Sequence, residues 1–264
     1  MNEVIENFVL DSLNDSSKTI HELIIDVSNK KLPQHIQRKD YIRLTVRSLW
    51  EDGTLCRVDD SENWNKEGNK YCIFSKRYPN IELNEFDGKE AESVLIEEYF
   101  KSYGPSTIID ASWWSGLGIG RVRDILKESK QTFYEVSLNG WENKYILVDK
   151  KLDEIENLDD NRTNLKLLSY EDNLLKGYKQ SRKRFMPEKF FPLVYNPAGE
   201  ARPTIILNGK VIGIWTIEKT NNVLIIHLFN KIKKQEKNLL FNEAERLSTM
   251  INANYSISIG NILQ

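Results

Sequence analysis

The sequence predicts an α+β protein in which two helical modules, each closed by a β-hairpin, precede a β-rich C-terminal domain. Three patterns support this prediction. Apolar residues recur at helical spacing in two separate stretches, short runs that alternate apolar and polar residues follow each stretch, and strand-like runs predominate near the C-terminus. We expect domains at residues 1–78, 79–158 and 159–264.

The first module has the order of a winged-helix domain, with three helices followed by two strands. After a first helix, Thr19 and Glu22 stand at capping-box spacing and predict the start of the second helix. The third helix is expected from about Arg38. The runs TLCRV and KYCIF then alternate as the two strands of a hairpin, the wing.

The third helix of this module has one apolar and one basic side. Ile42 and Val46 lie on the apolar side, whereas Lys39, Arg43 and Arg47 recur every four residues on the opposite side. A DNA-facing helix needs an apolar side that holds it and a basic side that meets phosphates or base edges. We therefore predict DNA contact by these three cations, with an ordinary solvated face as the alternative.

The second module contains the most informative stretch of the chain, Tyr99–Arg123. Gly104 and Pro105 end one helix, because proline lacks the amide proton and the residue before it is pushed out of the helical region. Ser106 is expected to cap the next helix. The run QTFYEVSLNGWENKYILV, with an Asn-Gly turn, is predicted as the hairpin of this second winged helix.

Tryptophans supply candidates for contact with an unpaired base. Trp113 and Trp114 are adjacent and lie about 100° apart on a helix, so one of them is expected to be partly exposed. An exposed indole beside arginines suits stacking on a displaced base, and packing of both rings is the alternative. Trp64, in the loop of the first hairpin, is predicted either to wedge into DNA or to pack back on the hairpin.

Four strand-like runs and one long helix follow Leu165, and we expect a small antiparallel sheet or half-open barrel covered by a helix over Lys234–Met250. The acid-rich segment Asp149–Asp160 is expected as a solvated connector before this domain. The apolar side of the covering helix is predicted to comprise Leu239, Leu240, Ala244 and Leu247.

Basic residues gather in two further places. Lys176–Lys189 holds six basic residues and one acidic residue, with aromatic residues between them. Such a run is either an exposed, solvated face or a phosphate-binding segment. We predict DNA contacts by Arg182 and Arg184 in this run, and by Arg121 and Arg123 after the paired tryptophans.

Three segments resemble blocks of the winged-helix DNA glycosylases of the AlkZ/YcaQ type. YFKSYGPSTIIDASWWSGL resembles that family's "ryf..yGPat..DfawWsGL", LLSYEDNLLKGYKQSR resembles "LLpaFDeyLlGYkdR", and PTIILNGKVIGIW resembles "PtvlvdGrvvGtW". The matching residues of the second and third blocks are Asp172, Gly177, Tyr178, Pro203, Gly209, Gly213 and Trp215.

This resemblance implies tandem winged helices, a β-rich domain and binding to duplex DNA. It also implies a monofunctional DNA glycosylase that excises a bulky or modified base, in repair or in defence against modified foreign DNA. The family is expected to carry a Gln-aliphatic-Gln or Gln-aliphatic-Asp motif on an extra N-terminal winged helix. This sequence shows no such motif, since Gln34 and Gln37 are three positions apart rather than two. By the order of the blocks, residues 1–78 correspond to the family's middle winged helix, which makes the chain a shortened member, and a non-catalytic winged-helix regulator is the alternative.

Cleavage of an N-glycosidic bond builds positive charge on the sugar, which a carboxylate stabilises while a second group orients water. Asp110 is the first candidate carboxylate and Asp172 the second, because both lie in matched blocks beside aromatic residues. Asp110 as a cap or ion-pair partner and Asp172 as the start of a helix are the structural alternatives. Gln34 and Gln37 are weaker candidates for water positioning.

Composition sets the remaining expectations. The 264-residue chain has a net charge of −2, with 40% hydrophobic and 29% charged residues, and shows neither a long apolar run nor a signal peptide. We expect a cytoplasmic monomer that binds double-stranded DNA and no membrane. Cys56 and Cys72 are expected to be reduced structural thiols, because their spacing is not that of a zinc site.

No cofactor or metal is expected. The three histidines are too dispersed to indicate a metal site, and no histidine and cysteine set suits a deaminase. The glycines Gly116, Gly118 and Gly120 lack Rossmann spacing and a Walker lysine, so they are interpreted as a turn between helices.

Overall fold

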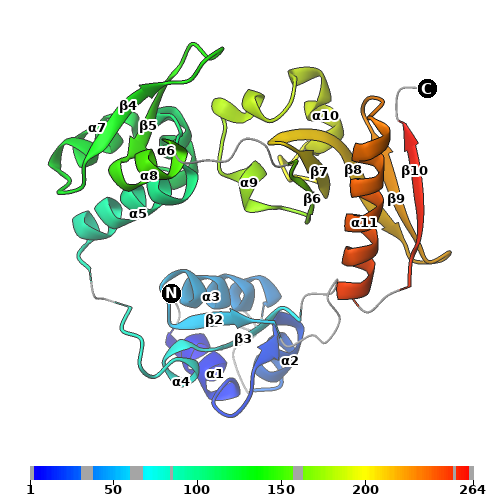
Figure 1. Ribbon diagram of the computed structural model, residues 1–264. Helices are drawn as coiled ribbons and strands as arrows, with labels where there is room; N and C mark the ends of the chain where they lie inside the picture. The colour runs from blue at the N-terminus through cyan, green and yellow to red at the C-terminus, as the bar shows by residue number, and fades with distance from the viewer. Residues whose placement is uncertain are drawn as a thin grey trace. The chain divides into compact units, whose positions relative to one another are not determined.

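The computed structural model describes residues 3–30, 38–59, 68–83, 86–156, 163–251 and 254–261. The chain divides into two compact units, Met1–Asp87 and Gly88–Gln264, each with its own core. Figure 1 shows the helices and strands of both units.

The first unit combines helices with a three-stranded sheet of order β1-β3-β2, in which the strand pairs are antiparallel. Its elements are α1 (Glu3–Ser12), β1 (Lys18–Thr19), α2 (Ile20–Ser28), α3 (Lys39–Glu51), β2 (Leu55–Val58), β3 (Lys70–Ile73) and α4 (Phe74–Arg77).

Local sequence signals account for the helices of the first unit. Thr19 caps α2 by accepting the Glu22 backbone N–H, and the Glu22 carboxylate accepts the Thr19 N–H, which confirms the predicted capping box. On α3, Ile42 and Val46 are buried at the spacing of one helical face. Together with Leu23 of α2, they contribute to one hydrophobic core.

The second unit begins with three helices, a hairpin and a fourth helix. These elements are α5 (Gly88–Tyr103), α6 (Ile108–Ser115), α7 (Ile119–Glu128), β4 (Phe133–Ser137), β5 (Lys144–Val148) and α8 (Asp149–Glu156). Gly116 ends α6 in the left-handed conformation at φ 76°, and Gly118 precedes α7, so these two glycines form the predicted inter-helix turn, whereas Gly120 lies within α7.

Two sequence expectations for this region need correction. Thr107, not Ser106, caps α6, because the backbone of Ser106 is already paired with that of Ile146 at the edge of the hairpin. Residues 149–156 of the acid-rich connector form the helix α8, which follows β5 without a break.

The rest of the second unit is built on a five-stranded sheet of order β10-β9-β8-β7-β6. Short helices follow the first strand, and the long helix α11 lies alongside the sheet (Figure 1). The elements are β6 (Leu165–Leu168), α9 (Asn173–Lys176), η1 (Ser181–Arg184), η2 (Glu188–Phe190), α10 (Phe191–Val194), β7 (Thr204–Leu207), β8 (Lys210–Glu218), β9 (Val223–Leu228), α11 (Lys234–Met250) and β10 (Ser256–Asn261).

The expected antiparallel sheet of four strands is wrong in one respect, because the sheet has a fifth strand, β10, that was not predicted and is not antiparallel. The strands β6 to β9 pair antiparallel, but β10 pairs parallel to β9, with Ser256 opposite Val223. Parallel neighbours need a crossover connection, and α11 supplies it. The helix α11 has the predicted bounds and buries Leu240, Ala244 and Leu247, whereas Leu239 is 39% exposed.

Among the described residues, no helix has the length and apolar character needed to cross a membrane. In the described parts of the chain, the first unit contains one hydrophobic core and the second unit contains three.

Gly213 of the third sequence block lets β8 and β9 approach closely. A Cβ at this position would lie 2.5 Å from the carbonyl oxygen of His227, whereas a Cβ at Gly260 of β10 would meet nothing within 4 Å. We expect Gly213→Ala to lower the free energy of unfolding by about 1–3 kcal/mol, because backbone must shift to make room. Gly260→Ala, the matched strand control, should change it by less than about 1 kcal/mol. Urea denaturation followed by circular dichroism measures both, and equal effects would contradict the steric explanation.

Candidate nucleic-acid interface

The buried carboxylate of Asp110 closes the N-terminus of α6. Thr107 Oγ1 accepts the Asp110 backbone N–H at 3.0 Å, and Asp110 Oδ2 accepts the Thr107 backbone N–H at 3.2 Å. This is a capping box with aspartate in place of glutamate. Asp110 is 0% exposed, so the carboxylate has no surface that solvent or a substrate can reach.

The same carboxylate also holds a distant segment of the chain. Asp110 Oδ1 accepts backbone N–H groups from Lys179 at 2.7 Å, Gln180 at 2.6 Å and Ser181 at 3.2 Å. Ser181 Oγ donates to Oδ2 at 2.5 Å. Hydrogen bonds to an ionised acceptor are stronger than neutral ones, so this group fixes the start of η1 against α6. Asp110 therefore positions the segment that carries Arg182 and Arg184.

Tyrosine hydroxyls add further links between α5 and this segment. Tyr99 donates to the carbonyl of Gly177 at 2.7 Å, and Tyr178 donates to the carbonyl of Tyr103 at 2.9 Å. Burial raises the pKa of Tyr99 and of Tyr178 above the ordinary tyrosine value. Both phenols therefore stay protonated at neutral pH and act as donors, not as general bases.

Arg182 lies between two aromatic rings. Its guanidinium carbon is 4.1 Å from the centroid of the Tyr195 ring and 5.6 Å from that of Trp113, within cation–π range of both. Its Nε donates to the Tyr178 carbonyl at 3.1 Å. Burial raises the pKa of Tyr195 to about 12, although the nearby Arg182 cation acts in the opposite direction. The two rings and the Tyr178 carbonyl thus hold Arg182 in place, and among the residues that the structure describes no carboxylate pairs with it.

Both paired tryptophans are partly exposed. Trp113 is 39% exposed and Trp114 is 38% exposed. The ring centroid of Trp114 lies 5.1 Å from that of Tyr99 and 5.8 Å from that of Tyr103, whereas the ring of Trp113 faces Arg182. The α6 helix therefore presents two indole rings at the surface, one of them beside a cation.

Arg184 is directed into the protein rather than outward. Its Nη1 donates to the carbonyl of Pro105 at 2.8 Å, and its guanidinium carbon lies 4.9 Å from the Tyr178 ring and 5.2 Å from the Tyr145 ring. Its buried Nε has no hydrogen-bond partner among the described residues. Arg184 therefore ties η1 to the turn before α6, and Arg182 is the member of this pair that borders the exposed indole.

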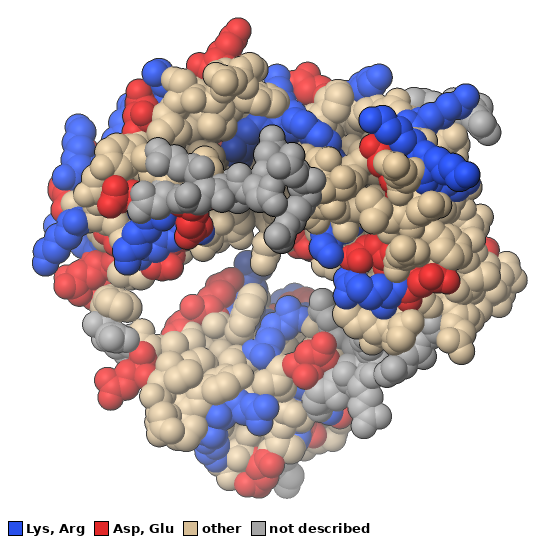
Figure 2. Space-filling view, in the orientation of Figure 1, with Lys and Arg blue, Asp and Glu red and all other residues tan. Residues whose placement is uncertain are grey.

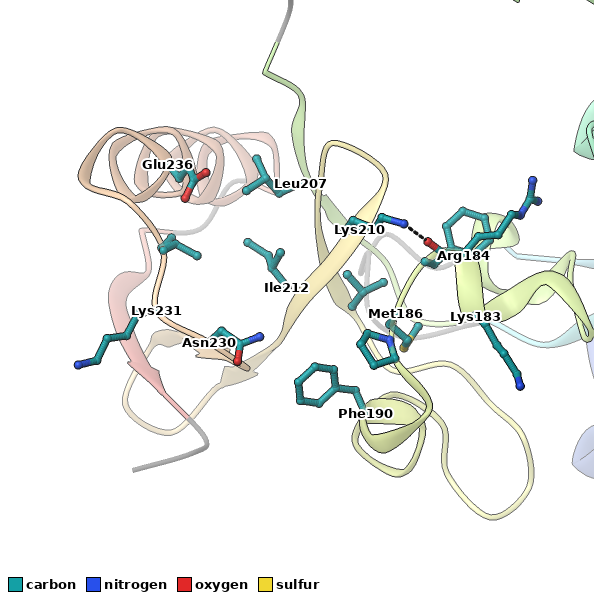
Figure 3. A pocket seen from close by; sticks show the side chains of 14 residues that line it. Lys183, Arg184, Met186, Phe190, Leu207, Lys210, Ile212, Asn230, Lys231 and Glu236 are labelled. Carbon is teal, nitrogen blue, oxygen red and sulfur yellow. Dashed lines mark hydrogen bonds between the residues drawn. The ribbon is translucent and has the colours of Figure 1, made fainter. Parts of the chain in front are cut away.

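A cavity of about 510 Å³ lies between η1 and the start of β8 (Figure 3). Met186, Phe190 and Ile212 give it an apolar wall, while the side chain of Lys183 points away from it. Lys210 Nζ donates to the carbonyl of Arg184 at 2.6 Å. This bond fixes the end of η1 to the sheet.

The basic side of α3 in the first unit is exposed, as expected. Lys39, Arg43 and Arg47 all lie on the surface, and the two arginines make ion pairs with Asp40 at 3.4 Å and with Glu51 at 2.7 Å. Exposed ion pairs of this kind contribute little to stability and are easily exchanged for other partners. On the face of each unit seen in Figure 2, basic and acidic side chains likewise lie next to one another.

Sequence reasoning missed two apolar residues on the same helix. Tyr41 is 48% exposed and Leu44 is 61% exposed. They stand three positions apart, which places them on one side of a helix, and this spacing was the available signal. The Arg38 guanidinium lies 5.5 Å from the Tyr41 ring. The exposed side of α3 is therefore both cationic and apolar.

The other residues predicted to contact DNA or to take part in catalysis do not gather at one site. Arg121 is ion-paired with Glu92 at 2.6 Å, and Arg123 is exposed on α7. Asp172 Oδ1 accepts the Leu174 backbone N–H at 2.9 Å and so caps α9, in agreement with the alternative prediction that Asp172 begins a helix. Three further candidates, Gln34, Gln37 and Trp64, lie outside the described residues.

Within the described ranges, no group of three or more histidine, cysteine or acidic side chains is arranged to hold a metal ion.

Comparison with known proteins places this architecture among enzymes that act on DNA. Residues 12–250 match the family described as DNA glycosylase AlkZ-like. The chain therefore belongs to the AlkZ-like DNA glycosylase family. The solved structure of the Streptomyces sahachiroi DNA glycosylase AlkZ is similar in fold, with a TM-score of 0.74 and 18% sequence identity over 98% of this chain and 69% of that one. No curated protein sequence matches the chain.

The hydrogen bonds of Asp110 predict a large effect of a small change. In Asp110→Asn, one acceptor oxygen becomes an NH₂ group that faces N–H or O–H donors, so we expect a loss of about 2–4 kcal/mol in the free energy of unfolding. Asp172→Asn is the matched control, because asparagine caps helices as well as aspartate does, and it should cost less than about 0.5 kcal/mol. Urea denaturation followed by tryptophan fluorescence measures both. If Asp110→Asn were as stable as the control, the carboxylate would not have the positioning role assigned to it.

Proposed function

We propose that this protein is a monofunctional DNA glycosylase that removes a bulky or modified base from duplex DNA and leaves an abasic site. Family membership over residues 12–250 supports glycosylase chemistry. The observation that carries the proposal in this chain is the exposed Trp113 beside Arg182, both held by the buried Asp110 network. An indole face suits an unpaired base, and a guanidinium suits the adjoining phosphate.

We further propose that residues 1–78 and 79–158 are two winged helices and that residues 159–264 form the β-rich third domain. In the first winged helix, α3 is the DNA-facing helix, and Lys39, Arg43 and Arg47 contact phosphates. The ion pairs of the two arginines with Asp40 and Glu51 are exposed, so DNA phosphates can replace the carboxylates at little cost. Arg121, Arg123 and Arg182 supply further cations in the second unit.

Hydrolysis of the glycosidic bond transfers the oxygen of a water molecule to the sugar and releases the base, which must first leave the helical stack. Asp110 and Asp172 both have their carboxylates engaged with backbone N–H groups, and we assign them positioning roles. Gln34 and Gln37 stay the candidates for orienting water. Trp113, Trp114 and Trp64 are the candidates for stacking or for wedging into the duplex.

The reaction is tested with duplex oligonucleotides that carry one modified base. The protein is incubated with duplexes containing alkylated purines or hypermodified pyrimidines, and hot alkali then cleaves the strand at abasic sites. We expect strand breaks only at the modified position. Cleavage of alkylated purines favours a repair role, whereas cleavage of hypermodified pyrimidines alone favours defence against foreign DNA.

A non-catalytic DNA-binding protein built on the same fold is the second candidate, and the engaged state of both carboxylates favours it. Duplex binding without strand breaks on any of these substrates would support this second candidate and contradict the glycosylase proposal.

The interface itself predicts a selective loss of affinity. Trp113→Ala should weaken binding to a duplex with one unpaired base by about 5- to 150-fold, because stacking on an aromatic ring contributes about 1–3 kcal/mol per base. Binding to fully paired duplex should change less, since no base is then available for the indole. Fluorescence anisotropy at fixed salt concentration measures both affinities.

Arg246→Gln is the control for this experiment, because it removes an exposed cation of the second unit that pairs with Glu243 on α11. Its affinity for both duplexes should stay close to that of the wild type. An equal loss in the Trp113→Ala and Arg246→Gln variants would show that Trp113 does not stack on a base.

A further inference from the structure

Two thiols face each other across the hairpin of the first unit. Cys56 of β2 and Cys72 of β3 are directly opposed in the antiparallel register. Their Sγ atoms are 3.3 Å apart, and both side chains are half-buried and free. The chain contains only these two cysteines. The fold therefore brings both thiols of the protein into contact.

The hairpin geometry suits a bond between them. Phe74 N–H donates to the Thr54 carbonyl at 2.9 Å, and the pair Cys56 and Cys72 comes two residues after Thr54 and two residues before Phe74. They therefore occupy a hydrogen-bonded pair, in which Cα atoms are about 5.5 Å apart. Disulfides span Cα separations of about 4.4–6.8 Å. The backbone thus needs no rearrangement for the two sulfurs to join.

The core of the first unit does not obstruct such a bond. Successive side chains of a strand point to opposite faces. Tyr71 and Ile73 pack against the hydrophobic core, so Cys72 between them points to the other face. Leu55, next to Cys56, is likewise buried in the core. The sulfurs can therefore approach each other without displacing a core side chain.

We propose that Cys56 and Cys72 form a reversible dithiol–disulfide couple that exchanges with low-molecular-weight disulfides such as glutathione disulfide. The thiolate of one cysteine attacks glutathione disulfide, forms a mixed disulfide and releases one glutathione. The second cysteine then loses its proton, attacks the protein sulfur of the mixed disulfide and releases the second glutathione. Two protein thiols are oxidised, and one disulfide is reduced to two thiols.

The rate of this exchange depends on deprotonation of the cysteines, because the thiolate and not the thiol attacks a disulfide. Burial and the contact with Cys56 raise the pKa of Cys72 to about 11, so Cys72 is almost entirely protonated at neutral pH. The exchange should therefore be faster at higher pH. The resulting bond joins β2 to β3 at positions that are 16 residues apart in the sequence. It closes the intervening chain into a loop and so restricts the unfolded state more than the folded one.

The experiment uses the full chain and needs no assumption about DNA. The protein is equilibrated without oxygen at a series of ratios of reduced glutathione to glutathione disulfide, quenched with acid, alkylated and weighed by intact-mass spectrometry. We expect the native protein to lose the mass of two hydrogens and to regain them when the reduced form of glutathione is restored. The oxidised form should also unfold at a higher temperature than the reduced form.

A variant separates the two steps. Cys72→Ser should retain one bound glutathione, because the thiol needed for the second attack is gone, and the double variant Cys56→Ser/Cys72→Ser should keep its mass at every ratio. Circular dichroism checks that the variants are folded. If wild-type protein in excess glutathione disulfide kept two alkylatable thiols, or formed the intramolecular bond only after unfolding, the proposal would be overturned whether or not the protein excises bases.

Discussion

The second unit depends on one buried carboxylate that serves two parts of the chain. Asp110 caps its own helix and also accepts N–H groups from three consecutive residues that lie about 70 positions further along. A buried carboxylate is tolerated only where hydrogen bonds replace the water that it has lost. Six donors do so here. Loss of this carboxylate would therefore leave three consecutive backbone N–H groups of the arginine segment without their acceptor, although Tyr99, Tyr178 and Arg184 still join the segment to the helices.

The surface features follow from this anchor. The segment after Asp110's partners carries Arg182, whose Nε is fixed by a backbone carbonyl and whose guanidinium lies between Trp113 and Tyr195. A side chain that is already ordered loses less entropy when it binds a ligand. The indole and the guanidinium are thus preorganised in the free protein, which supports their assignment to an interface rather than to a solvated helix face.

Local signals in the sequence were sufficient for most of the elements. The capping residues Thr19 and Glu22 marked a helix start, and apolar spacing gave α11 its bounds. Ser106 was assigned the cap that belongs to Thr107, because its pairing with Ile146 is a contact between segments that are distant in the sequence. The hydrogen bonds of Asp110 to residues 179–181 were missed for the same reason. The spacing of apolar residues shows which face of a helix or strand is buried, but it does not show which other segment of the chain packs against that face.

The strand β10 was not among the four predicted runs, although its residues Ser256–Ile259 alternate between polar and apolar side chains, and its parallel pairing with β9 cannot be inferred from such a short run. The resulting sheet has a simple property, in that its strands lie in space in the order in which they occur in the chain. Each strand can join the one completed just before it, so no strand has to be inserted between two that are already paired. Such a sheet can be assembled during synthesis on the ribosome, from the β6 edge towards the C-terminus, in the order in which its strands are made.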